Sequence, residues 1–463
     1  MFTRDEARAI VDRVLAASPA RATELILRGR ELRHLRLAES APSEQNVVSD
    51  PSLQVRVEHE GRYGRASTSL LDDAAIERVL DAAYRAAKLS PPLDLPPLAA
   101  GAAHDDSNSD GGVDEAAARS LLARDSATKL EALAPALRAV AEAGAAATGF
   151  WDTTVESCTY ATSAGCFRHT WLARDWFSST VLAGDGGAGV AHDGQLDASM
   201  LVASRADAVV RQALDLALRS KKARAIEARE QRVLLAPQAV GELLLFLSWS
   251  GFGARNWLEE RSFLRRRRDE VVLDPSISIL DDAAAFGGLG FDFEGQDRRR
   301  VTLIDEGLAR LPVFDRPTAK EARASTGLDV ETSGHAGLQP SADGPLPRHL
   351  RFVVADAKQT PARELEACLG DGLIITQFHY TNLIDPTAVT VTGMTRNGTF
   401  LVEGGRVVAP VRNLRFTVDI LDVLSTIEAA SIETQVVEAF FGGAAMSVPS
   451  LVLPRFRFTS TQS

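Results

Sequence analysis

The eight histidines of the chain are the first residues to examine for metal chemistry. A zinc peptidase needs two histidines on one helix, a glutamate beside them and a further ligand from elsewhere in the chain. The bound zinc lowers the pKa of its water from 15.7 to about 7, and the glutamate takes the proton. No two histidines here stand at helical spacing; they are His34, His59, His104, His169, His192, His335, His349 and His379. The sequence therefore predicts no zinc ligands in this chain.

Signatures of other enzyme classes are also missing. The sequence has no GxSxG serine, no Walker A loop, and no GxGxxG that follows a strand and opens a helix. The run Gly287-Gly288-Leu289-Gly290 precedes an acidic loop rather than a helix, so we do not expect it to bind phosphate. The residue patterns therefore predict no catalytic residue.

Two groups of polar residues remain as candidates. The acidic set Asp281, Asp282, Asp292 and Glu294 could hold a hard cation. Carboxylates also stabilise turns by accepting hydrogen bonds from their own backbone. We interpret the acidic set as turn-forming residues, and cation binding stays open. The segment Phe378–Asn382 carries several hydrogen-bonding side chains at a strand end. Its alternative interpretation is a half-buried histidine at a sheet edge.

The composition is that of an ordinary soluble protein. The 463 residues are 45% hydrophobic and 24% charged, with a net charge of −11. This acidic balance argues against a nucleic-acid or anionic-membrane partner. Two basic runs, Arg265–Arg268 and Arg298–Arg300, are flanked by carboxylates and are interpreted as solvated loops. The N-terminus lacks an apolar signal region and no apolar run could span a membrane, while three cysteines are typical of a reducing cytoplasm. We expect those cysteines to be buried and reduced.

The first half of the chain predicts an α+β domain with an antiparallel sheet. A capping box of Thr3 and Glu6 starts the first helix, and a second helix follows Asp72. Residues 90–113 are rich in Pro, Gly and Asp and predict a mobile loop that contains His104. Further helices are expected at Asp114–Leu122, at Thr128–Ala145 in two pieces broken by Pro135, and at Asp207–Lys222. Strands are expected at Glu24–Arg28, Glu31–Ala38, Leu53–Glu58, Tyr63–Ser67, Thr153–Tyr160, Cys166–Ala173 and Trp176–Ala183.

The second half predicts a β-rich domain around one buried helix. A strand at Val233–Leu235 leads into a helix that starts at Pro237 and is apolar around nearly its whole circumference. We place the domain boundary before this strand, near residues 225–229, giving domains of residues 1–225 and 226–463. Further helices are expected at Thr360–Leu369 and Leu421–Ala429. Strands are expected at Val271–Asp274, Ile277–Leu280, Val301–Asp305, Leu308–Phe314, Arg351–Ala355, Gly372–His379, Val389–Thr392, Gly398–Glu403, Arg406–Pro410, Asn413–Val418 and Ser450–Arg457.

An ordered series of short motifs in the second half resembles a known family. After the buried helix come SFL (Ser262–Leu264), FDFEG (Phe291–Gly295), IDEGLARLPVFDRPTAKEARASTG and a long C-terminal stretch that begins GLIITQFHYTNLIDPTAVTVTG. The segments GRASTSLLDDAAIERVLDAAYRAA and TSAGCFRH add to it in the first half. Together these motifs resemble the TldD/PmbA family, also called modulators of DNA gyrase, over nearly the whole chain.

The resemblance implies a fold and a function. It implies two domains and a dimer of two paralogous chains that enclose a peptidase site. In the catalytic TldD-type chain, zinc is held by a His-Glu-x-x-x-His helix and a later ligand. Those six positions read Leu245, Phe246, Leu247, Ser248, Trp249 and Ser250 here. The chain therefore resembles the PmbA (TldE) subunit, which has no metal of its own, and zinc is expected in the partner subunit.

We accordingly expect a cytoplasmic, non-catalytic TldE/PmbA-like subunit of a heterodimeric zinc metallopeptidase that cleaves or matures peptides. Candidate peptide-binding residues are Phe378, His379, Tyr380, Asn382, Thr392, Arg396 and Asn397. The peptide could add as a strand to an exposed sheet edge. Two alternatives stay open: a homodimeric peptide-binding or scaffold protein, and a stand-alone enzyme with altered chemistry that uses His379 with Asp292 and Glu294.

Overall fold

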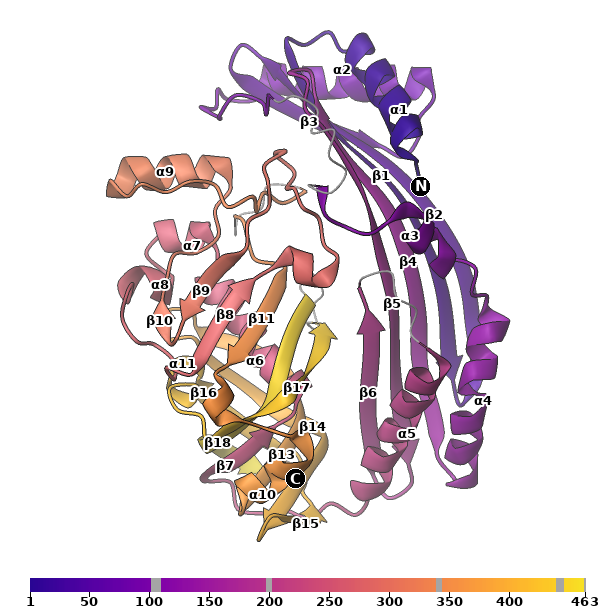
Figure 1. Ribbon diagram of the computed structural model, residues 1–463, viewed down its shortest axis with the longest axis vertical. Coiled ribbons are helices and arrows are strands. Elements are labelled where there is room, and N and C mark those ends of the chain that lie inside the picture. The colour runs from indigo at the N-terminus through magenta and orange to yellow at the C-terminus, as the bar shows by residue number, and fades with distance from the viewer. Residues whose placement is uncertain (101–109, 197–201, 339–343, 439–444, 462–463) are drawn as a thin grey trace.

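Two sheets of strands lie side by side, and helices cover the outer face of the first (Figure 1). The computed structural model describes residues 1–100, 110–196, 202–338, 344–438 and 445–461. The last helix of the first domain ends at Arg219, and the first strand of the second domain begins at Glu230. The predicted domain boundary lies between these two residues. The predicted α+β fold, with an antiparallel first sheet and a strand-rich second domain around a buried helix, is confirmed.

The first sheet is antiparallel throughout, with the order β3-β2-β1-β4-β5-β6. Its strands are β1 (Ala22–Ala38), β2 (Ala41–His59), β3 (Arg62–Thr68), β4 (Ala146–Thr162), β5 (Phe167–Ala183) and β6 (Gly187–Gln195). Its helices are α1 (Arg4–Ala17), α2 (Asp73–Leu89), α3 (Glu115–Leu121), α4 (Ser126–Glu142) and α5 (Ala203–Arg219). Side chains alternate along each strand. In β4, Trp151 and Val155 pack under the helices, while Thr154 and Glu156 face the second domain.

The strands of this sheet are longer than predicted. The expected segments Glu24–Arg28 and Glu31–Ala38 form one strand, β1, because the pairing with β4 runs without a break from Glu24 to Leu37. Gly29 lies in the middle of β1, where a Cβ would stand 2.6 Å from the Cα of Met1. Glycine at this position leaves room for the N-terminus to cross the sheet. Gly29 therefore interrupts the alternation of apolar and polar side chains without interrupting the strand.

One further expectation for the first domain needs correction. Pro135 does not break α4, which is one helix from Ser126 to Glu142. Its apolar face, with Leu133, Ala136 and Val140 fully buried, holds both halves against the sheet. The predicted mobile loop stays a prediction, since residues 101–109, with His104, lie outside the described residues. Its described end at Asp110 is fully buried and bonded to Arg168.

The second domain contains a closed ring of strands. Its strands are β7 (Glu230–Leu235), β8 (Ile277–Asp281), β9 (Val301–Asp305), β10 (Leu308–Ala309), β11 (His349–Val354), β12 (Gln359–Thr360), β13 (Gly372–Asp385), β14 (Thr390–Glu403), β15 (Arg406–Pro410), β16 (Leu414–Asp419), β17 (Ala429–Glu438) and β18 (Ala445–Thr461). In the order β18-β16-β14-β13-β7, the last strand also pairs with β18. The pairing therefore closes a barrel, although β13 pairs with β7 only from Leu373 to Ile375.

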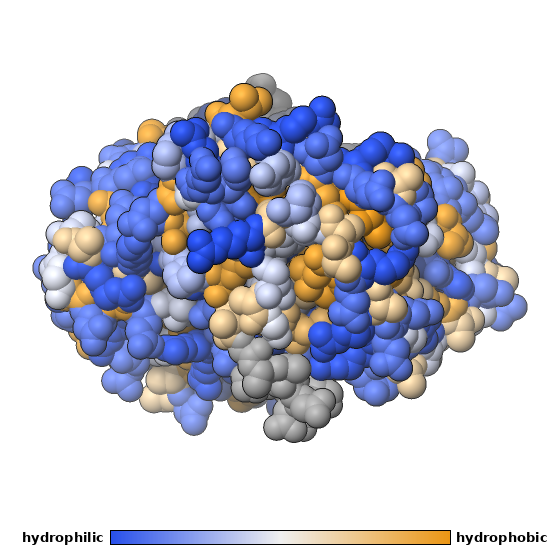
Figure 2. Space-filling model, turned by 90° about the horizontal axis from the view of Figure 1, so that it is seen from above, coloured by the Kyte–Doolittle hydropathy of each residue, from blue (hydrophilic) through white to orange (hydrophobic). Residues whose placement is uncertain are grey.

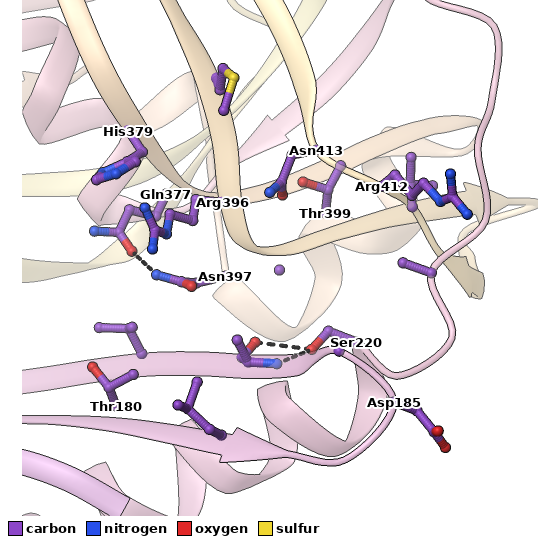
Figure 3. Close-up of a pocket in the computed structure, with 18 of the residues that line it drawn as sticks. Thr180, Asp185, Ser220, Gln377, His379, Arg396, Asn397, Thr399, Arg412 and Asn413 are labelled. Carbon is purple, nitrogen blue, oxygen red and sulfur yellow. Dashed lines mark hydrogen bonds between the residues drawn. The ribbon is translucent and has the colours of Figure 1, made fainter. Parts of the chain in front are cut away.

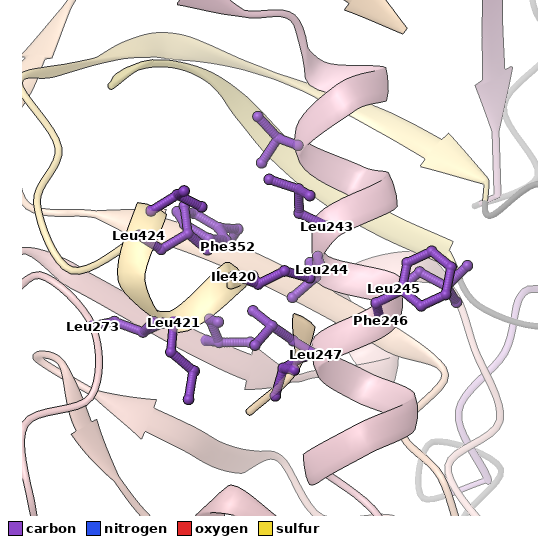
Figure 4. Packing of buried hydrophobic residues seen from close by; sticks show 14 of the residues in the cluster. Leu243, Leu244, Leu245, Phe246, Leu247, Leu273, Phe352, Ile420, Leu421 and Leu424 are labelled. Carbon is purple, nitrogen blue, oxygen red and sulfur yellow. The ribbon is translucent and has the colours of Figure 1, made fainter. Parts of the chain in front are cut away.

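Helix α6 (Pro237–Gly251) forms the centre of the largest core cluster. Proline suits the first turn of a helix, which explains why α6 starts at Pro237. Its surface is apolar on all sides, which explains why the helix is buried. Figure 4 shows Leu243, Leu244 and Leu247 pointing toward Ile420 and Leu421. The remaining helices are α7 (Ala254–Leu258), α8 (Phe263–Arg266), α9 (Arg316–Thr326), α10 (Leu365–Leu369) and α11 (Ile420–Val423), with 3-10 turns at Ala283–Phe286, Asp356–Lys358 and Ala362–Glu364.

Several elements of the second domain differ from expectation. The predicted helix Leu421–Ala429 is only the short α11, and the strand β17 that follows was not predicted. Helix α9 was also missed. The segments Val271–Asp274 and Leu308–Phe314 are mostly irregular, with β10 the one strand in them. Arg298 is not a solvated residue of a basic run but a buried one, and Cys368 is exposed, whereas Cys158 and Cys166 are buried and free as expected.

The end of the molecule that carries α2 and α9 is largely hydrophilic, with small separate apolar areas (Figure 2). None of the helices in the described part of the chain has both the length and the apolar run that crossing a bilayer requires.

Candidate functional site

A cavity of about 1020 Å³ lies between the two domains. The turn between β5 and β6 and the end of α5 bound it on one side; β13, β14 and the segment before β16 bound it on the other (Figure 3). Its polar lining residues include Thr180, Asp185, Ser220, Lys222, Gln377, His379, Tyr380, Arg396, Asn397, Thr399, Arg412 and Asn413. Both domains are therefore needed to form it.

The β13–β14 hairpin is irregular where it meets the cavity. Its register shifts between Ile375 and Gln377, and Asn397 has a left-handed φ of 58°. Gly398 follows with φ 141°, and a Cβ there would stand 2.8 Å from Oγ1 of Thr376. That hydroxyl donates a hydrogen bond of 3.0 Å to the Gly398 carbonyl. A bulge of this kind re-aims side chains, and it brings Arg396 and Asn397 to the cavity.

Hydrogen bonds fix part of the cavity wall (Figure 3). Nδ2 of Asn397 donates to Oε1 of Gln377 across 2.9 Å. The hydroxyl of Ser220 donates to the Ala188 carbonyl (2.9 Å) and accepts from the Ala188 N–H (3.0 Å). Burial lowers the pKa of His379, and the nearby Arg396 lowers this pKa further, so the imidazole is mainly neutral at pH 7.

Four of the seven predicted peptide-binding residues line this cavity. They are His379, Tyr380, Arg396 and Asn397. Tyr380 is 74% exposed and has a left-handed φ of 52°, a conformation that is rare for a bulky residue. Its ring centroid is 4.1 Å from that of His379. Sequence and structure thus agree on one wall of the cavity, and peptide binding by these residues stays a prediction.

The other three predicted residues do not line the cavity. Phe378 lies in the core with its ring centroid 4.5 Å from that of Phe416, because neighbours along a strand face opposite sides. Asn382 is exposed, and its amide donates to the Tyr380 carbonyl. Thr392 donates to the Phe416 carbonyl across 2.9 Å within the sheet. These side chains serve the hairpin itself.

The opposite wall was missed from the sequence. Asp185 and Lys222 of the first domain line the cavity together with Arg412 and Asn413 of the second. The Gly184-Asp185-Gly186 run marks a turn, but a turn sequence carries no information about which distant strand it meets. The pairing of these two walls depends on how the domains pack.

The middle turns of helix α6 are closed to solvent. Leu245, Phe246 and Leu247 are between 0% and 3% exposed, and Ser248 and Ser250 are also buried. The ring of Phe246 meets that of Trp249 edge to face at 5.6 Å. Figure 4 places Leu245 and Phe246 on the opposite side of the helix from Leu243 and Leu247. Both faces of α6 are thus used for packing.

The second half of the chain matches a known protein family. Residues 228–460 match the family described as PmbA/TldA metallopeptidase C-terminal domain, which is half of the chain. The chain belongs to the PmbA/TldD family. It is similar to a metalloprotease of Methanocaldococcus jannaschii, 22% identical over 241 residues, and to an uncharacterized protein of the same organism, 30% identical over 119 residues. It spans only 51% and 28% of the length of those two proteins.

Solved structures show the same fold over the full PmbA/TldD chain. A protein of Thermotoga maritima described as a modulator of DNA gyrase has a TM-score of 0.78 at 14% identity, with 98% of this chain and 100% of that chain covered. TldE from Thermococcus kodakarensis has a TM-score of 0.77, also at 14% identity and the same coverage. A modulator of DNA gyrase from Bacteroides thetaiotaomicron has 0.77 at 16% identity, with 99% and 100% covered. At these identities the likeness concerns the fold alone.

The residues of α6 do not fit the zinc that the family implies. Leucine, phenylalanine and tryptophan side chains have no atom that binds zinc at the positions of the family motif. The one carboxylate on α6 is Glu242, and burial raises its pKa, which favours the neutral acid over a metal ligand. Among the described residues, no three or more His, Cys, Asp and Glu side chains are placed to hold a metal ion.

The acidic set of this PmbA/TldD chain is not one cluster. Asp281 is fully buried and accepts from Arg298 (3.0 Å) and His335 (2.7 Å). Burial alone would raise the pKa of Asp281, but these partners outweigh it and hold the pKa well below its usual range. Asp292 instead accepts three backbone N–H bonds of 2.9 Å, as expected for a turn-forming carboxylate.

The alternative of a stand-alone enzyme that uses His379 with Asp292 and Glu294 is not favoured by this geometry. His379 lines the cavity described above, whereas Asp292 lines a different cavity of about 500 Å³, together with Phe291 and His349. The two candidates therefore line different cavities.

Replacing Glu294 by glutamine is expected to flatten the pH dependence of stability. Burial, with the charges of Asp292 and Asp315, raises the pKa of Glu294 from 4.5 to about 8. Between these values the folded protein keeps a proton that the unfolded chain has lost. The contribution to stability is therefore full below pH 4.5 and is lost as the pH rises to 8. Urea unfolding at about pH 5 and about pH 8 should show a smaller loss for Glu294→Gln than for the wild type.

The control is Glu331→Gln, which removes a carboxylate that is 67% exposed and paired with Arg299 at the surface. It should leave the pH dependence as in the wild type. Equal pH dependence in Glu294→Gln and the wild type would contradict the raised pKa.

Proposed function

We propose that this chain is a TldE/PmbA-like subunit, without a metal of its own, of a heterodimeric zinc metallopeptidase that cleaves or matures peptides. The observation that carries the proposal is the middle of α6. Where the catalytic chains of the family carry His-Glu-x-x-x-His, this chain has Leu245, Phe246 and Ser250, all buried in the core. Zinc and its activated water would then come from the partner, a TldD-like chain with the histidine motif.

The role of this chain in the pair would be to help enclose and orient an extended peptide. The cavity between its domains is large enough for several residues and presents His379, Tyr380, Arg396 and Asn397. Its wall includes β13, whose backbone could pair with a peptide strand. Backbone pairing would recognise many sequences, which suits a subunit that presents different substrates.

The proposed setting is the cytoplasm, with neither nucleic acid nor a membrane as partner. All three cysteines are free, which suits a reducing compartment. The net charge of −11 disfavours binding to polyanions by the molecule as a whole.

Peptidase activity is expected only from the mixture of this chain with a TldD-like chain. Each chain would be purified alone and together, and cleavage of peptides would be measured with and without a chelator. A partner variant with glutamine in place of the motif glutamate should lower the rate of the mixture by about 10²–10⁴-fold, because it removes the general base while keeping the complex.

The outcomes separate the proposal from its alternatives. Chelator-sensitive cleavage by this chain alone would contradict a metal-free subunit. A homodimer in sedimentation, with no association with any TldD-like chain, would favour a homodimeric peptide-binding or scaffold protein instead.

A further inference from the structure

The cavity of about 500 Å³ is walled by both domains and is rich in arginine. Arg28 and Arg174 of the first domain line it, as do Arg298 and Arg348 of the second. Three of the four have a carboxylate partner: Glu156 for Arg28, Glu438 for Arg174 and Asp281 for Arg298. These three guanidinium charges are therefore neutralised within the protein.

The guanidinium of Arg348 has no such partner. The backbone N–H of Arg348 donates to Asp281, but its side chain forms no ion pair or hydrogen bond with any residue in the described part of the chain. Arg348 is exposed where it lines the cavity. Burial against the surrounding protein nevertheless lowers the pKa of its guanidinium, and Arg298 lowers this pKa further, although Asp281 partly opposes the shift. A cation held beside another cation without a counter-charge of its own favours the binding of an anion.

His349 adds a second polar group without a partner. Neither of its ring nitrogens bonds to a residue that the structure describes, and its Nδ1 is closed to solvent. Burial lowers the pKa of His349 to about 3, so the ring is neutral at pH 7 and carries one N–H. A Cβ at Gly288 would stand 2.7 Å from Nε2, so glycine at this position keeps space beside that nitrogen. In the tautomer with its proton on Nε2, the ring can donate to a ligand.

Much of the remaining lining is apolar. Leu289, Phe293 and Leu338 line the cavity and are half-buried. The carboxylate of Asp292 is 2% exposed and accepts three backbone N–H bonds, so it is not placed to neutralise Arg348. One available cation among apolar walls suits a singly charged anion with an apolar body better than a phosphate group. A guanidinium also presents a planar fork of donors that fits both oxygens of a carboxylate.

We propose that this cavity binds a carboxylate joined to an apolar group, with the carboxylate on Arg348 and His349 and the apolar group against Leu289, Phe293 and Leu338. Such a ligand has two possible sources, which are the C-terminus of a peptide that ends in an apolar residue and a free apolar acid. The proposal goes beyond the function proposed above and does not depend on it.

The test is isothermal titration calorimetry on the full chain alone. The probes are phenylpropionate and an acetylated tetrapeptide of three alanines and a final phenylalanine, each compared with its uncharged amide. At least one acid should bind about tenfold more tightly than its amide, and its affinity should fall as sodium chloride is added. Tighter binding of the tetrapeptide acid would identify a peptide C-terminus as the source, and tighter binding of phenylpropionate would identify a free acid.

Substitutions localise the binding. Arg348→Gln should weaken binding of the acid by about tenfold and leave binding of the amide unchanged. Arg348→Lys keeps the charge without the planar fork and should give an intermediate affinity. Phe293→Ala should weaken the acid and the amide alike, by about three- to tenfold, because both lose the same apolar contact.

Arg351→Gln is the matched control. Arg351 lies three residues further along the same segment, is 38% exposed in its pair with Asp282, and does not line the cavity. Its replacement should leave the affinity for the acid as in the wild type. The urea unfolding midpoint of Arg348→Gln should also equal that of the wild type, because the lost side chain has no partner within the protein.

Three results would overturn the proposal. Equal affinity for both acids and their amides would remove the carboxylate as the recognised group. An equal loss of affinity in Arg348→Gln and Arg351→Gln would remove this cavity as the site. Tighter binding of inorganic phosphate than of either acid would replace the apolar carboxylate by another ligand class. Because the assay needs neither a partner subunit nor catalysis, it can fail while the mixture of subunits remains active, which would leave the proposed function intact.

Discussion

Replacing Asp281 by asparagine is expected to lower the free energy of unfolding by about 3–5 kcal/mol. Its carboxylate is fully buried and accepts four hydrogen bonds, two of them from the N–H groups of Arg348 (2.8 Å) and His349 (2.7 Å). The Arg298 side chain is only 7% exposed. Asparagine would leave this guanidinium buried without a counter-charge and would turn an amide group toward existing donors.

The measurement is urea unfolding of the wild type and the variant, followed by tryptophan fluorescence. Asp282→Asn is the matched control, since the neighbouring carboxylate pairs with Arg351, which is 38% exposed, at 3.2 Å. Asp282 is itself nearly buried, but both of its partners, Arg351 and Arg300, reach solvent, so its loss should cost clearly less than the loss of Asp281. Equal losses in the two variants would show that Asp281 is not the centre of a buried charge network.

Phe246→Ala is expected to destabilise the protein by about 3–5 kcal/mol. Phe246 is 3% exposed within α6 and packs against Trp249. Alanine would remove the whole ring and leave a cavity that the surrounding barrel strands cannot collapse to fill. In this chain Phe246, at the position of the family's glutamate, would thus have a packing role. Loss of its ring would lower the stability of the fold before it affected any other property.

The comparison with Phe246→Leu makes this test specific. Leucine keeps most of the buried apolar volume and should cost less than about 1.5 kcal/mol. Phe246→Glu should destabilise the fold at least as much as alanine, because it buries a carboxylate without a partner. An unchanged unfolding midpoint in Phe246→Ala, together with altered peptidase activity of the mixed subunits, would instead assign the ring to the substrate site.

Local signals in the sequence were sufficient for the helices whose ends they specify. The capping box of Thr3 and Glu6 starts α1 as predicted, with both reciprocal hydrogen bonds formed. Helix α9 has equally local signals, a cap at Asp315 and glycine at Gly327, and could have been predicted from them. Strand β17 could not, because it forms by pairing with β18, and no neighbouring residues encode that choice.

One wall of the candidate site could be predicted from the sequence and the other could not, because only the first depends on local signals. Polar residues at the end of a strand predicted a site at His379. The bulge that exposes Arg396 lies nearby on the paired strand. Asp185 and Lys222 come from a turn and a helix end that meet this wall only when the domains pack. Sequence spacing describes a face of one element, whereas a cavity between domains requires contacts between distant ones.

The closure of the barrel also affects how the protein is made. β7 pairs directly with β18, as in the contact of Leu235 with Leu451, although one begins the domain and the other is its last strand. The ring therefore cannot close on the ribosome until β18 has emerged, which at about 5–20 residues per second takes tens of seconds. During that time α6, apolar on every side, lacks the strands that bury it. We therefore expect the first domain, whose elements are complete by α5, to fold ahead of the second.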